Sequence, residues 1–192
     1  MGYVPVHTPQ SGFSLVETIV AIAILLLALV GPLTIATKGI QAGEYSKEQT
    51  IALYLAQEGI EAFVAARNNA EVTQVETPGS TWNWNWIPSG TCTGSDGCGI
   101  DFANSDPLSR AVKCNPVTKC ILSLDESASR AKFLLPGTGT PTEFTRVITI
   151  TNGPDGGAAG SRYVTATVSW QGTLFNTAVQ QVSLTRALYQ IN

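Results

Sequence analysis

The sequence is poor in the residues on which most catalytic and nucleic-acid-binding sites depend. Among its 192 residues there is one histidine, His7, and charged residues make up only 13%. With one histidine, no Ser–His–Asp or Cys–His set can be assembled. The eleven lysines and arginines are scattered from Lys38 to Arg186, and no basic patch indicates nucleic-acid binding. We therefore expect no enzyme, no cofactor and no specific contact with nucleic acid.

The sequence also lacks the pattern of a phosphate-binding loop. The Gly-rich stretch 153–160 follows one strand-like segment and precedes another, whereas a phosphate-cradling loop opens a helix. Lysine and arginine are absent before Lys38, so no positive charge precedes the first apolar run as it does in a secretory signal peptide. An uncleaved signal anchor is one alternative for such a beginning. Charge bias gives no orientation in a membrane here.

One long apolar run dominates the N-terminal part of the chain. The twenty residues from Thr18 to Thr37 carry no formal charge. As a helix they would span ~30 Å, the thickness of the hydrocarbon core of a bilayer. Glu17 stands at the front edge of this run. An ionisable group beside hydrocarbon is costly, so Glu17 is a candidate functional residue.

Residues 11–17, SGFSLVE, followed by the apolar run, resemble the processing site of type IV prepilins and type II secretion pseudopilins. The resemblance implies that residues 1–12 are a leader peptide, and that a prepilin peptidase/methyltransferase cuts between Gly12 and Phe13 and N-methylates Phe13. It further implies that Glu17 neutralises the freed amine of Phe13 on a neighbouring subunit during assembly. Prepilin leaders usually carry Lys or Arg, and this sequence departs from that pattern.

The region from Phe13 to about Asn69 is predicted to be one long helix, ending near Asn68-Asn69. Residues 13–38 would form a hydrophobic transmembrane and filament-core segment, and residues 39–70 its amphipathic continuation. Gly31 and Pro32 are expected to break or kink the helix, because proline removes an N–H and clashes one turn back. The pilin family implies that such a place melts locally in a filament.

From Glu44 onward the pattern becomes amphipathic, which predicts a helix face that packs under a globular head. One set at helical spacing is Ile51, Leu55, Glu58 and Ala62, with Leu53, Ile60, Phe63 and Val64 close by. The segment from Tyr54 to Glu61 also resembles PilV-like minor pilins.

Four cysteines lie within 29 residues, at Cys92, Cys98, Cys114 and Cys120. A four-cysteine zinc site is possible, but five residues within each pair are more than the usual two to four. Two disulfides suit an exported head better. Of the three possible pairings we favour Cys92–Cys98 and Cys114–Cys120, because short loops close easily.

Two further groups in the region 71–141 invite functional interpretations. Trp82, Trp84 and Trp86 alternate with asparagines, so a strand would place the indoles on one face. They would cover the core of the head or, alternatively, form an exposed face for a sugar, a surface or a neighbouring subunit.

Asp96, Asp101 and Asp106 raise the alternative of a calcium site. Their spacing does not match an EF-hand, and turn-forming aspartates are the commoner explanation. We therefore expect no metal.

The C-terminal part, 142–189, predicts a three-stranded antiparallel meander with one buried face. Phe144, Arg146, Ile148 and Ile150 would share one side of the first strand. A second strand, 164–170, alternates apolar and small polar residues, and a third ends near Leu188. The segments 142–146 and 168–186 resemble PilV-like and pseudopilin sequences.

Together these features predict an α+β protein with the type IV pilin fold: a long N-terminal helix packed against a C-terminal antiparallel sheet. Residues 71–192 would form an extracytoplasmic head, with a variable region at 71–141. The resemblance implies a structural subunit, a minor pilin, that waits in the cytoplasmic membrane and then enters an extracellular pilus. Its partners would be other pilin subunits, the peptidase and an inner-membrane assembly platform. The alternatives are a pseudopilin of a secretion or DNA-uptake system and a membrane-anchored binding or adhesion module.

Overall fold

The structure is a computed structural model that describes residues 12–75, 84, 87, 91–100, 111–127, 132–135, 139–154, 160–172 and 178–189. The chain divides into two compact units, Met1–Glu44 and Tyr45–Asn192. We call the first the N-terminal unit and the second the globular unit. One helix, α1 (Leu15–Val75), contributes its first part to the N-terminal unit and its second part to the globular unit.

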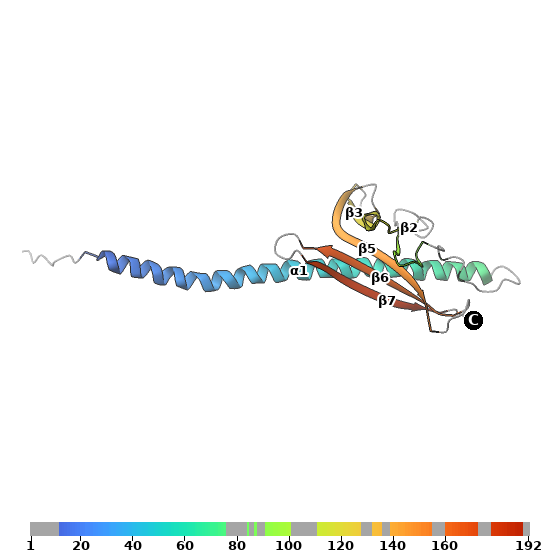
Figure 1. The fold of residues 1–192 in the computed structure, drawn as a ribbon, viewed down its shortest axis with the longest axis horizontal. Coiled ribbons are helices and arrows are strands. Elements are labelled where there is room, and N and C mark those ends of the chain that lie inside the picture. Colours follow the sequence, from blue (N-terminus) through green and yellow to red (C-terminus); the bar gives the residue numbers. More distant parts are fainter. Residues whose placement is uncertain are drawn as a thin grey trace, which may run out of the picture. The chain divides into compact units, whose positions relative to one another are not determined.

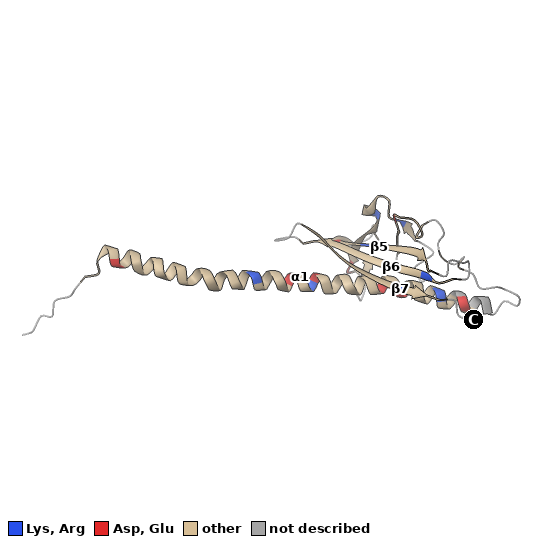
Figure 2. Ribbon diagram, turned by 60° about the horizontal axis from the view of Figure 1, so that its bottom comes forward, with Lys and Arg blue, Asp and Glu red and all other residues tan. Residues whose placement is uncertain are grey.

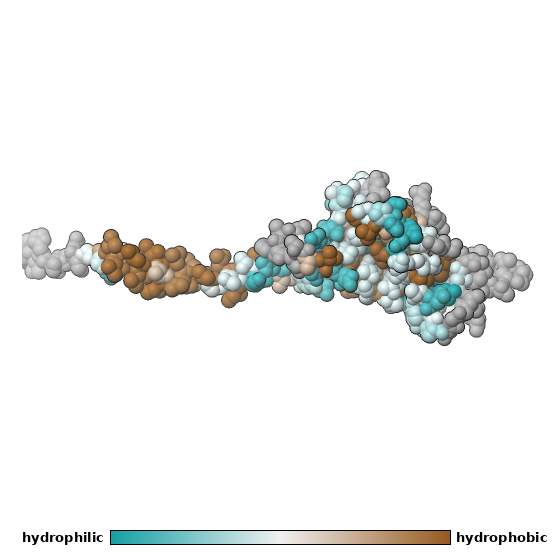
Figure 3. Space-filling view, viewed as in Figure 1, coloured by the Kyte–Doolittle hydropathy of each residue, from teal (hydrophilic) through white to brown (hydrophobic). Residues whose placement is uncertain are grey.

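The described part of the N-terminal unit consists of the start of α1 and the three residues before it. Its apolar side chains are exposed all round the helix, and the face of this segment that Figure 3 shows is almost continuously hydrophobic. Glu17 is the only charged residue between Gly12 and Lys38 (Figure 2). By length and composition, α1 is apolar enough to cross a membrane. Nothing within the described part of this unit covers its apolar surface.

The predicted break in α1 and its predicted end differ from the structure, whereas a kink at Gly31-Pro32 stays a prediction. The helix continues through Gly31 and Pro32 without a break. Proline removes only one N–H from the ladder, and the turns on both sides keep their bonds, with the Thr34 hydroxyl donating to the Val30 carbonyl at 2.8 Å. The helix also passes Asn68-Asn69 and ends at Val75. No glycine or proline follows the asparagines until Pro78, so nothing in the chain stops the helix earlier.

The globular unit is a seven-stranded antiparallel sheet packed on the second part of α1 (Figure 1). The predicted meander is confirmed as the three long strands, β5 (Thr140–Asn152), β6 (Arg162–Gln171) and β7 (Val179–Leu188). The other elements, in chain order, are β1 (Cys98–Gly99), β2 (Val112–Lys113), the 3-10 helix η1 (Val117–Cys120), β3 (Ile121–Asp125) and β4 (Lys132–Leu134).

The long strand β5 organises this sheet. One of its edges pairs with β6, and its other edge pairs with β3 near the start and with β1 at Ile148. β2 continues the sheet beyond β1, and β4 continues it beyond β3. These short strands give the region 71–141 more regular secondary structure than its sequence indicates. They are two to five residues long, which is too short for the alternation of apolar and polar residues that identifies a strand.

The core lies between the inner face of the sheet and α1. β5 buries alternate residues as predicted, and β6 buries Val164, Ala166, Val168 and Trp170. The helix presents Leu55, Ala56, Ile60 and Phe63 to them, with Gly59 at the closest approach. A side-chain carbon placed on Gly59 would lie 3.0 Å from the Cδ1 of Ile148. The absence of a side chain at Gly59 therefore lets the helix lie close to the sheet. Leu53, which was expected near this face, is instead exposed.

Candidate functional site

The first candidate site is the start of α1. Ser14 precedes the first helical residue, and its hydroxyl accepts a hydrogen bond from the backbone N–H of Glu17 at 3.2 Å. This is the arrangement of a helix N-cap. A serine before the apolar run therefore fixes the start of the helix two residues after the Gly12-Phe13 bond. The negative charge of Glu17 lies in the first turn, where the helix dipole favours it.

The residues around the predicted cleavage point are open to solvent. Gly12 and Glu17 are exposed, and the side chain of Phe13 is 80% exposed. Within the part of the chain that the structure describes, chain neighbours aside, no atom lies within 4 Å of the position that a side-chain carbon on Gly12 would occupy. Among the described residues, the Glu17 carboxylate forms no salt bridge. The geometry therefore leaves an accessible peptide bond and an accessible carboxylate one helical turn apart.

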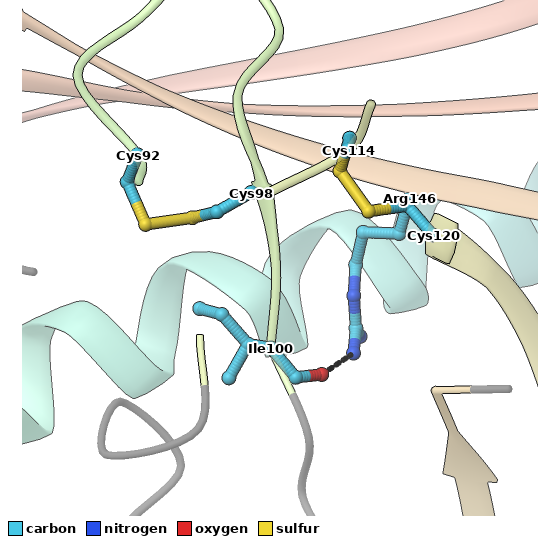
Figure 4. Close-up of a disulfide and its surroundings, with 6 residues drawn as sticks. All are labelled: Cys92, Cys98, Ile100, Cys114, Cys120 and Arg146. Carbon is cyan, nitrogen blue, oxygen red and sulfur yellow. Dashed lines mark hydrogen bonds between the residues drawn. A yellow bond between two sulfur atoms is a disulfide. The ribbon is translucent and has the colours of Figure 1, made fainter. Parts of the chain in front are cut away.

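The second candidate site is a buried arginine that ties the globular unit together. Arg146 lies on the inner face of β5, and none of its side chain is exposed. Its Nη1 contacts the Glu58 Oε2 at 2.5 Å and donates to the Leu55 carbonyl at 3.2 Å, both on α1. Its Nη2 donates to the Ile100 carbonyl at 3.3 Å (Figure 4). One guanidinium thus connects the central strand, the helix and the segment after β1.

The pKa of Arg146 is set by its burial and by Glu58. Burial lowers the pKa of Arg146, because desolvation disfavours the charged form, and the charge and hydrogen bond of Glu58 oppose that effect. The sequence placed both residues on faces predicted to be buried, without pairing them. The sequence did carry a sign that these two charges need partners, because each is the charged member of an otherwise apolar set at regular spacing.

The four cysteines form two disulfides with the favoured pairing, Cys92–Cys98 and Cys114–Cys120. Cys92, Cys98 and Cys120 are fully buried, and Cys114 is 5% exposed. Figure 4 shows both bridges together with Arg146, and the segment that carries Cys98 leads to Ile100. One bridge joins the loop before β1 to the first residue of that strand, and the other joins the residue after β2 to the end of η1.

Tryptophans line the core at both ends of the globular unit. Trp84 is 7% exposed, and its indole N–H donates to the Gly160 carbonyl at 2.9 Å, which agrees with a role in covering the core. The guanidinium of Arg162 lies 5.4 Å from the centre of the Trp84 ring. Trp82 and Trp86 lie outside the described residues. Trp170, which the sequence placed on a strand, donates to the Glu48 carboxylate of α1 at 2.9 Å.

Of the three aspartates considered for calcium, Asp96 is described, and Asp101 and Asp106 lie outside the described residues. Asp96 accepts a hydrogen bond from the Asn115 side chain at 3.1 Å and pairs with Lys113 at 3.2 Å. These contacts, the Asn115 hydrogen bond first, lower its pKa. Among the described residues no group of three or more His, Cys, Asp or Glu side chains could hold a metal ion.

A comparison with protein families matches residues 8–31 to the prokaryotic N-terminal methylation motif. No curated protein and no solved structure matches the chain. The matched residues include the predicted cleavage point, the exposed carboxylate and the first turns of α1. The chain therefore carries an N-terminal methylation motif typical of type IV pilins and pseudopilins, and its helix-on-sheet architecture is consistent with the type IV pilin fold.

Proposed function

We propose that this protein is a minor subunit of a type IV pilus-like filament, of the PilV-like kind. The observation that carries the proposal is the methylation motif on a helix whose apolar surface is uncovered within its own unit. Such a surface is stable only in lipid or against other subunits. The motif supports membrane anchoring before assembly and processing by a prepilin peptidase.

In the proposed maturation, cleavage between Gly12 and Phe13 removes the leader 1–12, and the new N-terminus is methylated. Residues 13–38 anchor the chain in the inner membrane, and the globular unit lies on the extracytoplasmic side. The assembly platform then moves the subunit into the filament. There the Phe13 amine of one subunit pairs with Glu17 of its neighbour, and both charges leave water together.

The pairing predicts a specific phenotype. Replacing Glu17 with alanine leaves one buried amine without its partner, which typically costs ~3–5 kcal/mol. Since ~1.4 kcal/mol is tenfold in an equilibrium, we expect incorporation into filaments to fall by about a hundredfold or more, with membrane insertion unchanged. The matched control is Glu44→Ala, because Glu44 is another exposed carboxylate on α1. Immunoblots of sheared filaments and membranes measure both quantities. Equal amounts of Glu17→Ala and parent protein in filaments would contradict the proposal.

A pseudopilin of a secretion or DNA-uptake system shares the same motif and is the second candidate. The immunoblot assay above separates the two candidates. A pilus subunit is recovered in sheared pili, whereas a pseudopilin stays with the secretion or DNA-uptake system. A membrane-anchored binding module is the candidate of another class, and it would keep residues 1–12. Mass spectrometry of the N-terminus of the protein from its host decides this point. A chain that begins at N-methylated Phe13 supports the pilin proposal, and one that begins at Met1 overturns it.

A further inference from the structure

The strand β7 is a long strand at the edge of the sheet. It pairs with β6 along its whole length, in one unbroken register from Arg162↔Leu188 to Gln171↔Val179. In the part of the chain that the structure describes, no strand pairs with its other edge. Figure 1 shows β7 as the outermost of the three long strands. The backbone groups of alternate residues along this ten-residue strand are therefore available on that side.

Two side-chain contacts identify which backbone groups face the free edge. The hydroxyls of Thr165 and Thr185 lie 2.9 Å apart, and so do those of Thr167 and Ser183. Such close side chains are typical of the non-hydrogen-bonded pairs of an antiparallel ladder. In these pairs each residue directs its N–H and C=O away from the partner strand. Ser183 and Thr185 therefore direct their backbone donors and acceptors to the open side of β7.

The other edges of the sheet are protected in ways that β7 is not. β2 is two residues long and ends with Lys113, and β4 is three residues long. Short edge strands and lysines are common devices against unwanted strand pairing, as are prolines and bulges. β7 contains no proline, its register has no bulge, and its only charged residue is Arg186. The sheet therefore blocks strand addition at two edges and permits it at β7.

The surroundings of the edge are also suited to another strand. The side chains of Gln181, Ser183 and Thr185, on the outer face of β7, are polar but uncharged, so Arg186 is the one charge that an approaching strand meets on β7. On the inner side, Val182 and Leu184 pack against the core but remain half-buried. A strand added beside β7 would cover these apolar side chains and extend the core. Backbone bonding and apolar burial therefore act in the same direction.

We propose that β7 accepts an extended, uncharged segment of a neighbouring filament subunit by strand addition. This inference rests on the proposed function, because filament assembly brings subunits together at high local concentration. The contact is heterologous: the β7 edge of one subunit meets a different segment of the next. A heterologous contact suits a minor subunit, whose neighbours in the filament are other pilins, whereas a β7–β7 pair would need two copies of this chain.

The first test removes one donor from the free edge. Proline is tolerated on an edge strand where its missing N–H faces outward, so Ser183→Pro should fold but block the added strand. The matched control is Ser183→Ala, which changes the side chain and keeps the N–H. In the host that makes the filament, we expect Ser183→Pro to reduce incorporation about tenfold and Ser183→Ala to keep it within about twofold.

The second test measures the edge directly in the parent protein, and it decides the matter if Ser183→Pro does not fold. Hydrogen exchange of the β7 peptide is compared between detergent-solubilised subunits and isolated filaments. We expect the amides of Ser183 and Thr185 to exchange at least about tenfold more slowly in filaments, because they become hydrogen-bonded.

The outcomes separate the two proposals. If the parent protein is absent from filaments, the proposed function fails and strand addition fails with it. If the parent is incorporated while Ser183→Pro folds and enters as well as Ser183→Ala, strand addition is overturned and the function stands. Unchanged exchange at Ser183 and Thr185 between subunits and filaments overturns it in the same way.

Discussion

Removing the carboxylate of Glu58 should destabilise the globular unit through Arg146. Exposed ion pairs contribute ~0–1 kcal/mol, and breaking a buried pair costs ~3–5 kcal/mol. This pair lies between the two limits, because the side chain of Arg146 is 0% exposed and that of Glu58 is 41% exposed. The two carbonyl contacts of Arg146 also survive the change. We therefore expect Glu58→Ala to lower the free energy of unfolding by about 2 kcal/mol.

The double variant Glu58→Leu/Arg146→Met provides the sharper test. It replaces the pair with apolar side chains, which leaves no buried charge without a partner and is often nearly neutral. We expect it to lose less stability than Glu58→Ala alone. Glu61→Ala, an exposed glutamate on the same helix, is the matched control and should change stability by less than about 0.5 kcal/mol.

Thermal unfolding of the detergent-solubilised full chain, with its disulfides intact, measures these effects. The fluorescence of the buried Trp84 and Trp170 reports on the globular unit. For a protein of this size ~1 kcal/mol shifts the midpoint by about 2–4 °C, so Glu58→Ala should unfold about 4–8 °C earlier. An unchanged midpoint for Glu58→Ala, or a double variant less stable than it, would refute the reasoning.

Three further outcomes are expected from the same unfolding assay. Gly59→Leu should cost ~2 kcal/mol or more, because the helix lies within contact of the sheet there, and Gly59→Ala should cost less because alanine favours the helix by about 1 kcal/mol. Cys92→Ser/Cys98→Ser should cost about 2 kcal/mol, the loop entropy of a short bridge. The pKa of Asp96 is lowered, first by the hydrogen bond from Asn115. The ionised carboxylate therefore stabilises the fold at pH values above the usual aspartate pKa near 4, and this stabilisation is lost as the pH falls through the lowered pKa. Asp96→Asn should therefore reduce the loss of stability below pH ~4, and an identical acid profile would contradict this.

The sequence was sufficient for the features that repeat or that lie close together in the chain. The uncharged run after Glu17 predicts the start of α1, and two-residue alternation predicts β5, β6 and β7. The disulfide pairing followed from short loops. In each case the information is local, because the same few residues that carry the pattern also form the structure.

The features that were missed depend on residues far apart in the chain. Arg146 and Glu58 are 88 residues apart, and Trp170 and Glu48 are 122 apart. Arg146, Glu58 and Trp170 were visible on predicted elements, whereas nothing in the sequence singled out Glu48, and a single sequence gives no pairing. The strands β1 and β4 were missed for another reason: they exist because they bond to neighbouring strands, not because of their own propensity.

The order of the elements also affects how the protein is made. The core-facing part of α1 is complete at Val75, but its main partner strand begins at Thr140, sixty-five residues later. At ~5–20 residues per second, synthesis from Val75 to Thr140 takes about 3–13 s, and Leu55 and Phe63 remain uncovered for at least that time. The last strand, β7, buries Leu188 later still. During that interval the nascent helix exposes the face it will later bury, and any factor that holds the emerging subunit must cover that face.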